Sequence, residues 1–147
     1  MSVNNFPPID DLPDWPDLED LMCTYFARFG TTVTQRPHPD EFNQRLTGGE
    51  VFIEIARAGG GAPDEGRLDL APIVVAVTST KRSTSWQVMG QIRKAVKVAN
   101  NGVTIDGILI HSITETGELS MIPQLGVDPR TVEMTFVTIT PMPRRTR

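Results

Sequence analysis

The fold is decided by residues 68–78, which read Leu68-Asp69-Leu70-Ala71-Pro72-Ile73-Val74-Val75-Ala76-Val77-Thr78. The centre of this stretch, Ile73 to Val77, is apolar without alternation, which is typical of a β-strand with apolar surroundings on both faces. Pro72 has no backbone N–H to donate, so we expect the strand to lie at a sheet edge or to contain a bulge near its start. Other parts of the chain must cover the two faces of such a strand.

One amphipathic helix is predicted before this strand. Apolar residues recur from Leu18 to Phe29 at the spacing of one helix face. Asp14 or Asp17 is the expected N-cap, since a carboxylate accepts from free N–H groups of the first turn. We expect Gly30 to end the helix in a left-handed conformation.

A second amphipathic helix is predicted directly after the strand. We assign its cap to Ser83 or Ser85 and its broad apolar face to residues 86–99. Asn100-Asn101-Gly102 supplies the residues that commonly end a helix. The two helices together are enough to cover one face of a small sheet.

The remaining strands are expected to pair as hairpin-like neighbours. They are predicted at residues 31–36, 51–56, 103–113, a short segment up to Ile122, and 132–140, whereas residues 37–49 are predicted to be a loop with one helical turn around 40–46. This order predicts an α+β fold, with a largely antiparallel four- to five-stranded sheet and two helices packed on one face.

The two ends of the chain differ in composition from the middle. Residues 1–16 contain four prolines and few apolar residues, which predicts an extended acidic arm. Residues 17–140 then form one α+β domain, and residues 141–147 form a basic tail that includes Arg144 and Arg145. Such charged ends suit either solvated termini or arms that contact partners.

The composition excludes several functional classes. The chain has 147 residues, a formal net charge of -4, one cysteine and two histidines. An acidic chain is a poor candidate for a freestanding DNA-binding domain, and so few Cys and His residues cannot build a common zinc site. No apolar run approaches the roughly 20 residues of a membrane span, and the N-terminus lacks the features of a secretory signal. Cys23 lies beside apolar helix positions and is interpreted as an inert small residue.

The sequence also contains no motif that indicates an enzyme. The segment from Gly61 to Leu68 has the glycine spacing of a phosphate-binding loop, but Arg67 and Leu68 replace the required Lys and Ser/Thr. A strand follows this loop, whereas phosphate binding needs a helix N-terminus. No nucleophile motif or fixed carboxylate pair is visible. We therefore expect no catalytic residue, no metal and no cofactor.

Two interaction surfaces can be proposed from the residues alone. Three predicted strands are apolar on both faces, so the face without helices needs a cover, and self-association would supply one. The alternative is that the proline-rich arm and the loop at residues 37–49 cover it. A basic patch between Lys81 and Lys97 provides a second candidate, a small nucleic-acid-binding module, although a solvated helix face is the more common origin of such a patch.

The order and spacing of these segments resemble the tail terminator, or tail completion, proteins of long-tailed bacteriophages. The resemblance covers about residues 17–140. It rests on the opening helix, a strand running into Arg57-Ala58-Gly59-Gly60-Gly61, the strand at 70–77, the helix from Trp86 to Ala99, and the closing strand with its basic tail. The acidic arm has no counterpart in the family pattern.

The resemblance implies a structural, non-enzymatic virion protein at the head-proximal end of the tail. Such proteins form a hexameric ring that caps the tail tube, stops its polymerisation and meets the head connector, while DNA passes through the lumen without sequence-specific binding. Another head–tail joining or minor tail protein is the alternative. The expected contact residues are Trp15, Arg57, Gly59, Gly60, Gly61, Arg67, Arg144 and Arg145.

Overall fold

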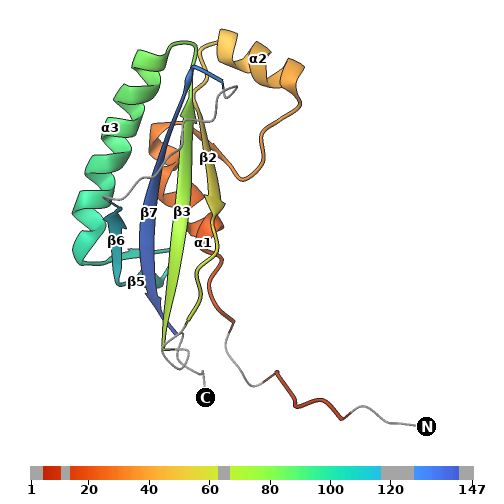
Figure 1. Cartoon of the computed structure of the whole chain (residues 1–147), viewed down its shortest axis with the longest axis vertical. Coiled ribbons are helices and arrows are strands. Elements are labelled where there is room, and N and C mark those ends of the chain that lie inside the picture. The colour runs from red at the N-terminus through yellow and green to blue at the C-terminus, as the bar shows by residue number, and fades with distance from the viewer. Residues whose placement is uncertain (1–4, 11–13, 63–66, 117–127, 143–147) are drawn as a thin grey trace.

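The structure is a computed structural model that describes residues 5–10, 14–62, 67–116 and 128–142. Its elements follow the order α1 (Leu18–Phe26), a 3₁₀ turn (Ala27–Phe29), β1 (Thr31–Val33), α2 (Pro39–Thr47), β2 (Phe52–Arg57), β3 (Leu68–Thr78), α3 (Arg82–Val98), a second 3₁₀ turn (Ala99–Asn101), β4 (Val103–Ile105), β5 (Ile108–Ile110), β6 (Ser112–Glu115) and β7 (Thr131–Pro141) (Figure 1).

A five-stranded sheet forms the centre of the protein. Its strand order is β1-β2-β3-β7-β6, with β1 parallel to β2 and all other pairs antiparallel. Strands β4 and β5 form a separate two-stranded hairpin. The prediction of an α+β fold with a largely antiparallel sheet is therefore confirmed. The structure adds a third helix and this hairpin.

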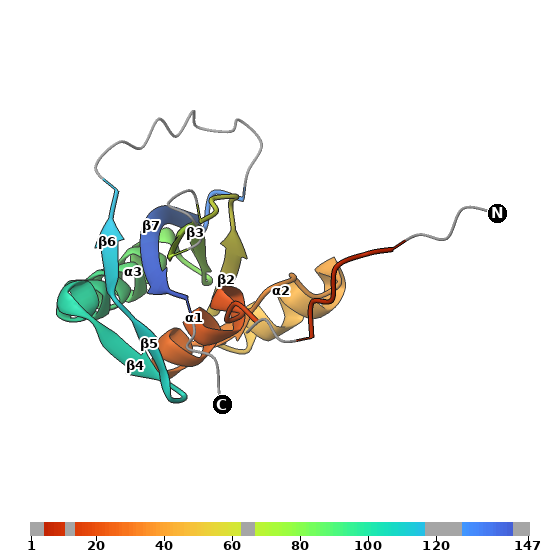
Figure 2. The same cartoon turned by 90° about the horizontal axis from the view of Figure 1, so that it is seen from below.

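Helices α1 and α3 pack on one face of the sheet (Figure 2). Period-two alternation directs Ile73, Val75 and Val77 of β3 toward these helices, and all three side chains are fully buried. Phe136 of β7 lies on the same face and packs near Phe26 of α1. We call this side of the sheet the closed face.

The start of α1 is confirmed, but the role of Gly30 is different from the prediction. Asp17 is the N-cap, and its side chain accepts a hydrogen bond from the backbone N–H of Asp20 at 3.1 Å. Gly30 has φ 169°, which is extended rather than left-handed. A Cβ at this position would lie 2.8 Å from the carbonyl oxygen of Val51, so close backbone approach is what requires glycine here.

Residues 37–49 form more regular structure than the predicted loop. Helix α2 begins with Pro39 at its first position and His38 as its cap. Its two buried residues, Phe42 and Leu46, are four positions apart and therefore lie on the same side of the helix. With only one apolar pair and many charged neighbours, the periodic signal was too short to predict the whole helix.

The N-cap of α3 lies two residues before Ser83, the nearer of its two predicted caps. Lys81 occupies the N-cap position and makes no side-chain cap bond. Ser85, predicted as a cap, is instead buried inside the first turn and donates to the Arg130 carbonyl at 2.6 Å. Its hydroxyl links the helix to the segment that precedes β7, so a tertiary contact takes the place of local capping.

The prediction for Pro72 is wrong in position. Strand β3 lies in the middle of the sheet, and its register with β7 runs without a bulge from Leu68 to Thr78. The backbone oxygen of Pro72 accepts from Ala58, just past the end of β2. The missing N–H therefore falls on the side where the neighbouring strand has already ended, and it interrupts no ladder.

The predicted long strand at 103–113 is divided by a tight turn. Asp106 and Gly107 both have positive φ, 49° and 78°, which joins β4 to β5 in a two-residue hairpin. Strand β6 then follows as a separate edge strand of the main sheet. The strands at 51–56 and 132–140 are confirmed within a residue or two, whereas the predicted strand up to Ile122 lies largely outside the described residues.

Candidate assembly surface

The second face of the sheet carries apolar side chains that the helices α1 and α3 do not cover. Residues that alternate with the closed-face residues point to this side, and we call it the open face. At one end of it lie exposed or half-buried side chains from three strands: Ala56, Leu68, Leu70, Pro72, Val74, Val137, Ile139 and Pro141. Leu70 is 37% exposed although it lies in the middle strand of the sheet. The described residues thus leave this apolar area of the sheet partly exposed.

The other end of the open face is covered by α2. Phe42 and Leu46 of this helix pack on Phe52 of β2, and the rings of Phe42 and Phe52 lie 4.8 Å apart. The loop alternative is thus correct for this end, where residues 37–49 do provide the cover. In the arm, by contrast, Phe6 and Ile9 are 79% and 73% exposed.

Ion pairs flank the end of the open face that α2 covers. The Arg36 side chain lies over the Phe42 ring and donates to Glu54 at 2.7 Å. Asp128 receives two hydrogen bonds from the Arg130 side chain, at 2.6 and 2.8 Å. Hydrogen bonds donated by Arg130 lower the pKa of Asp128, which favours the ionised carboxylate. One end of the open face is therefore covered by α2 and flanked by ion pairs, whereas the other end is apolar and partly exposed.

A partly buried ion pair lies at the base of the glycine loop, which comprises residues 58–62. The Arg57 guanidinium donates to both carboxylate oxygens of Asp69 at 2.8 Å, and its Nε donates to the Gly59 carbonyl at 2.8 Å. The hydrogen bonds to Asp69 raise the pKa of Arg57. Asp69 is 4% exposed, so the pair anchors β2, β3 and the loop to one another.

The glycines of this loop differ in whether a side chain would fit at their positions. Gly59 and Gly60 have φ of 88° and 86°, in the region that favours glycine. A Cβ at Gly60 would overlap the carbonyl oxygen of Leu70, whereas one at Gly59 would meet nothing within 4 Å. Gly61 forms a bridge with Leu70, and Arg67 accepts a backbone hydrogen bond from Met142 at 2.9 Å.

Trp15 lies between Asp14 and Pro16, which line a pocket with Pro141 and Met142 at the end of β7. It lies at the end of the arm and is 37% exposed. Arg144 and Arg145 lie outside the described residues. The remaining predicted residues, Arg57, Gly59, Gly60, Gly61 and Arg67, gather at one end of the sheet, next to the apolar half of the open face.

Sequence reasoning missed the partners of these residues. Asp69 was not singled out, although an acid at a closed-face position of an otherwise apolar strand signals a buried ion pair. Asp128 and Arg130 were also missed, because nothing in the local sequence predicts that they lie near Arg36. Leu70 could have been found from its register, once β3 was known to be the middle strand.

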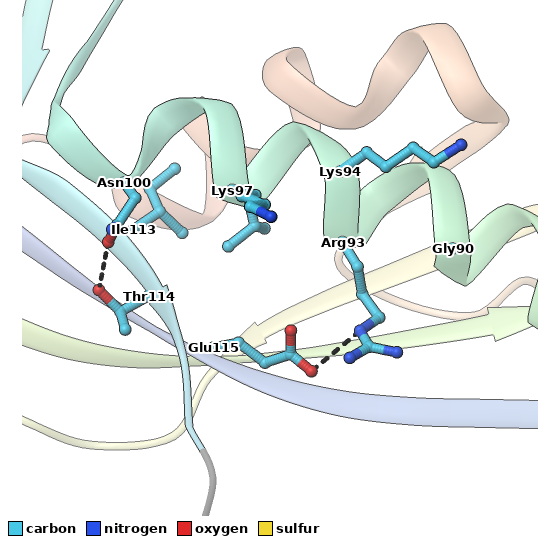
Figure 3. Close-up of a pocket in the computed structure, with 9 residues that line it drawn as sticks. Gly90, Arg93, Lys94, Lys97, Asn100, Ile113, Thr114 and Glu115 are labelled. Atoms are coloured by element: carbon cyan, nitrogen blue, oxygen red, sulfur yellow. Dashed lines mark hydrogen bonds and ion pairs between the residues drawn. The ribbon is translucent and has the colours of Figure 1, made fainter.

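The predicted basic patch is divided between two environments. Arg82 donates to the carbonyl oxygens of Pro129 and Thr131, both at 3.0 Å. Arg93, Lys94 and Lys97 line a groove of about 430 Å³ between α3 and β6, where Arg93 pairs with Glu115 at 2.9 Å (Figure 3). The patch is thus a short groove wall rather than a continuous basic surface.

The described residues offer little reactive chemistry. Burial raises the pKa of the Cys23 thiol, which disfavours the nucleophilic thiolate form. Within residues 5–10, 14–62, 67–116 and 128–142, no cluster of His, Cys, Asp and Glu is suited to holding a metal ion. No helix in those ranges has the length and apolar character needed to cross a membrane.

Comparison with known proteins agrees with this emphasis on assembly. A family model described as phage tail termination protein matches residues 14–147, which is most of the chain. No curated protein matches the sequence. The match includes the glycine loop, both faces of the sheet and α3, and it begins just inside the acidic arm. Proteins of this family are structural, non-catalytic components of the virion tail, and the family implies partners in the tail tube. The chain belongs to the phage tail termination protein family.

Proposed function

We propose that this protein forms a hexameric ring on the head-proximal end of the tail tube. The observation that carries the proposal is the apolar half of the open face, from Leu70 to Ile139, on a protein of a tail-terminating family. An apolar surface of this kind is costly in water and is typical of contacts between subunits. Copies that associate through such a face bury it.

Ring closure explains how growth of the tube stops. Contacts that join unlike surfaces of neighbouring copies produce a ring when the rotation between copies closes. One side of the ring then matches the end of the tube, while its other side offers no site for another tube subunit. That second side meets the head connector, and DNA passes through the lumen without reading of its sequence.

The glycine loop and its Arg57–Asp69 anchor supply a rigid rim beside this face. The bidentate pair fixes where the loop leaves β2, so residues around Gly59 and Gly60 extend from a defined position. We place Arg57, Arg67 and the glycines at the border of the contact between copies. Trp15, Arg144 and Arg145 are assigned to contacts with the tube or the connector.

The experiment combines particle imaging with tail length. Purified protein is incubated with isolated tail tubes and examined by electron microscopy, and its particle mass is measured in parallel. We expect six-copy rings at one end of each tube, and overlong tails in infections that lack the protein. A single-copy particle that leaves tube ends bare would overturn the proposal. Tails of normal length that fail to join heads would instead identify a connector role.

A further inference from the structure

We propose that the groove between α3 and β6 binds the acidic N-terminal arm of a second copy of this chain. This inference rests on the proposed function, because it describes a contact between neighbouring copies in the proposed ring. It uses a different surface from the open face. Four observations support it: the exposure of the arm, the charge of the groove, the shape of the groove beside an edge strand, and a glycine in its wall.

The arm carries apolar side chains that its own domain does not cover. Phe6 and Ile9 are 79% and 73% exposed and are separated by Pro7 and Pro8, which keep the backbone extended. In Figures 1 and 2 residues 5–10 lie on the far side of the domain from α3. The described part of the arm therefore extends away from its own groove.

Charge favours the pairing of arm and groove. The first twenty residues hold six of the 18 acidic residues and none of the 14 basic ones, so the remainder of the chain is net positive. Figure 3 shows Arg93, Lys94 and Lys97 along the α3 wall of the groove. Arg93 is paired with Glu115, whereas neither lysine forms an ion pair with any acid that the structure describes. Asp10 and Asp14 of an incoming arm would supply the missing carboxylates.

The shape of the groove suits an extended segment. Strand β6 is the edge of the sheet and has only β7 as a strand neighbour among the described residues. An exposed edge can accept an extended peptide through backbone hydrogen bonds. The floor contains Val96 and Ile113, and the stems of the two lysines extend the apolar wall for Phe6 or Ile9.

Gly90 is an independent observation that favours close approach by another chain at this groove. It lies within the 17-residue helix α3 and lines the groove, and a Cβ there would meet nothing within 4 Å. Glycine inside a helix is less stable than alanine, so packing within this chain gives no reason for it. Close approach by another chain would explain the choice of residue.

Cysteine cross-linking tests the inference, because the chain has a single natural cysteine. In a Cys23→Ser background, one variant carries Ile9→Cys and a second carries Thr114→Cys, so a disulfide between them can form only between copies. Mixing the two, with and without tail tubes, should give a cross-linked pair. A matched mixture of Ile9→Cys with Gln44→Cys, exposed on α2, should give about tenfold less product, because docking raises the local concentration of one thiol at the other.

Two sets of substitutions in the groove test whether its charge and its free space are needed for the cross-link. Reversal of both charges, in Lys94→Glu with Lys97→Glu, should lower the cross-link yield about fivefold or more, and Asp10→Lys in the arm variant should restore part of it. Gly90→Leu should fill the groove and reduce the yield, yet leave the urea midpoint equal or higher. A loss of yield accompanied by a lower midpoint would identify a folding defect and contradict the docking role.

The outcomes separate this inference from the proposed ring. Rings that form without preference for Thr114→Cys over Gln44→Cys would overturn arm docking and leave the ring intact. A cross-linked pair without rings would support arm docking and count against the ring. A double variant with Ile9→Cys and Thr114→Cys that closes only within one chain would place the arm in its own groove and contradict exchange between copies.

Discussion

The two faces of the central sheet are built from the same strands, yet they have opposite environments. Val75 is fully buried on the closed face, whereas its neighbour Val74 is half-buried on the open face. The same contrast holds in β7, where Phe136 is 1% exposed and Val137 points the other way. Since residue type is similar on both faces, position in the sheet decides whether an apolar side chain stabilises the fold or remains available to a partner. The closed face should therefore govern stability, and the apolar half of the open face should govern assembly.

The largest expected effect compares Phe136→Ala with Val137→Ala. Removing the Phe136 ring leaves a cavity between the sheet and α1, which should reduce the free energy of unfolding by about 3–5 kcal/mol. Val137→Ala should cost less than about 1 kcal/mol, because its side chain already contacts solvent. Urea denaturation of the two variants measures both values. Equal losses would contradict the distinction between the faces.

A second prediction concerns the anchor of the glycine loop. Arg57→Ala leaves the buried Asp69 carboxylate without its bidentate donor and should cost about 1.5–3 kcal/mol of unfolding free energy. Arg57→Lys retains the charge but not the planar pair of donors, so it should recover only part of the loss. Thermal unfolding of the two variants provides the measurement. A neutral effect of Arg57→Ala would mean that the residue acts only in contacts with partners.

Two glycines of the loop beside the open face, Gly59 and Gly60, allow a matched comparison of alanine substitutions. Gly59→Ala should cost about 1 kcal/mol, because only its positive φ is unfavourable to alanine. Gly60→Ala should cost about 2 kcal/mol, since the added Cβ also overlaps the Leu70 carbonyl. Equilibrium unfolding in urea distinguishes the two. If Gly59→Ala were the more damaging, the close approach of the loop to β3 would be incorrect.

The smallest expected effect is a pH dependence at the covered end of the open face. Hydrogen bonds from Arg130 lower the pKa of Asp128 below its usual value of 3.8. A depressed carboxyl pKa contributes stability above the unfolded value, and this contribution is lost as pH falls through the folded value. Asp128→Asn should therefore cost about 1 kcal/mol near neutral pH and progressively less below about pH 4.

Unfolding of Asp128→Asn and of the natural sequence between about pH 3 and 7 measures the effect. A stability difference that stays constant across this range would show that Asp128 acts through shape alone. Val75→Ala is the control, because a closed-face valine has no titratable partner and its cost should not change with pH.

The sequence predicted the long elements because each carries a complete periodic signal. The apolar run around Ile73 and the spacing from Leu18 to Phe29 are strong, and both correspond to observed elements. Helix α2 was largely missed, because its buried side rests on only Phe42 and Leu46. The hairpin at 103–110 was missed because its apolar run masked the Asp106-Gly107 turn signal, which requires two residues with positive φ.

The sequence predicts that an uncovered apolar sheet face exists, but it does not predict which residues form that face. Counting apolar residues indicates that a second sheet face needs cover, since two helices protect only one. The residues that remain exposed depend on where α2 packs and on the pairing of β3 with β7. Both depend on tertiary contacts between separate elements, such as Phe42 with Phe52 and Arg36 with Glu54.

The most direct test of assembly through the open face compares Val74→Lys with Gln87→Lys. Each variant places one lysine on the protein, at the apolar half of the open face or at an exposed position of α3. The measurement is the particle mass of protein bound to tail-tube ends, with urea unfolding in parallel. We predict that Val74→Lys remains folded, within about 1 kcal/mol of the natural sequence, but fails to form multi-copy particles, whereas Gln87→Lys assembles normally. Normal ring assembly by Val74→Lys would contradict the account.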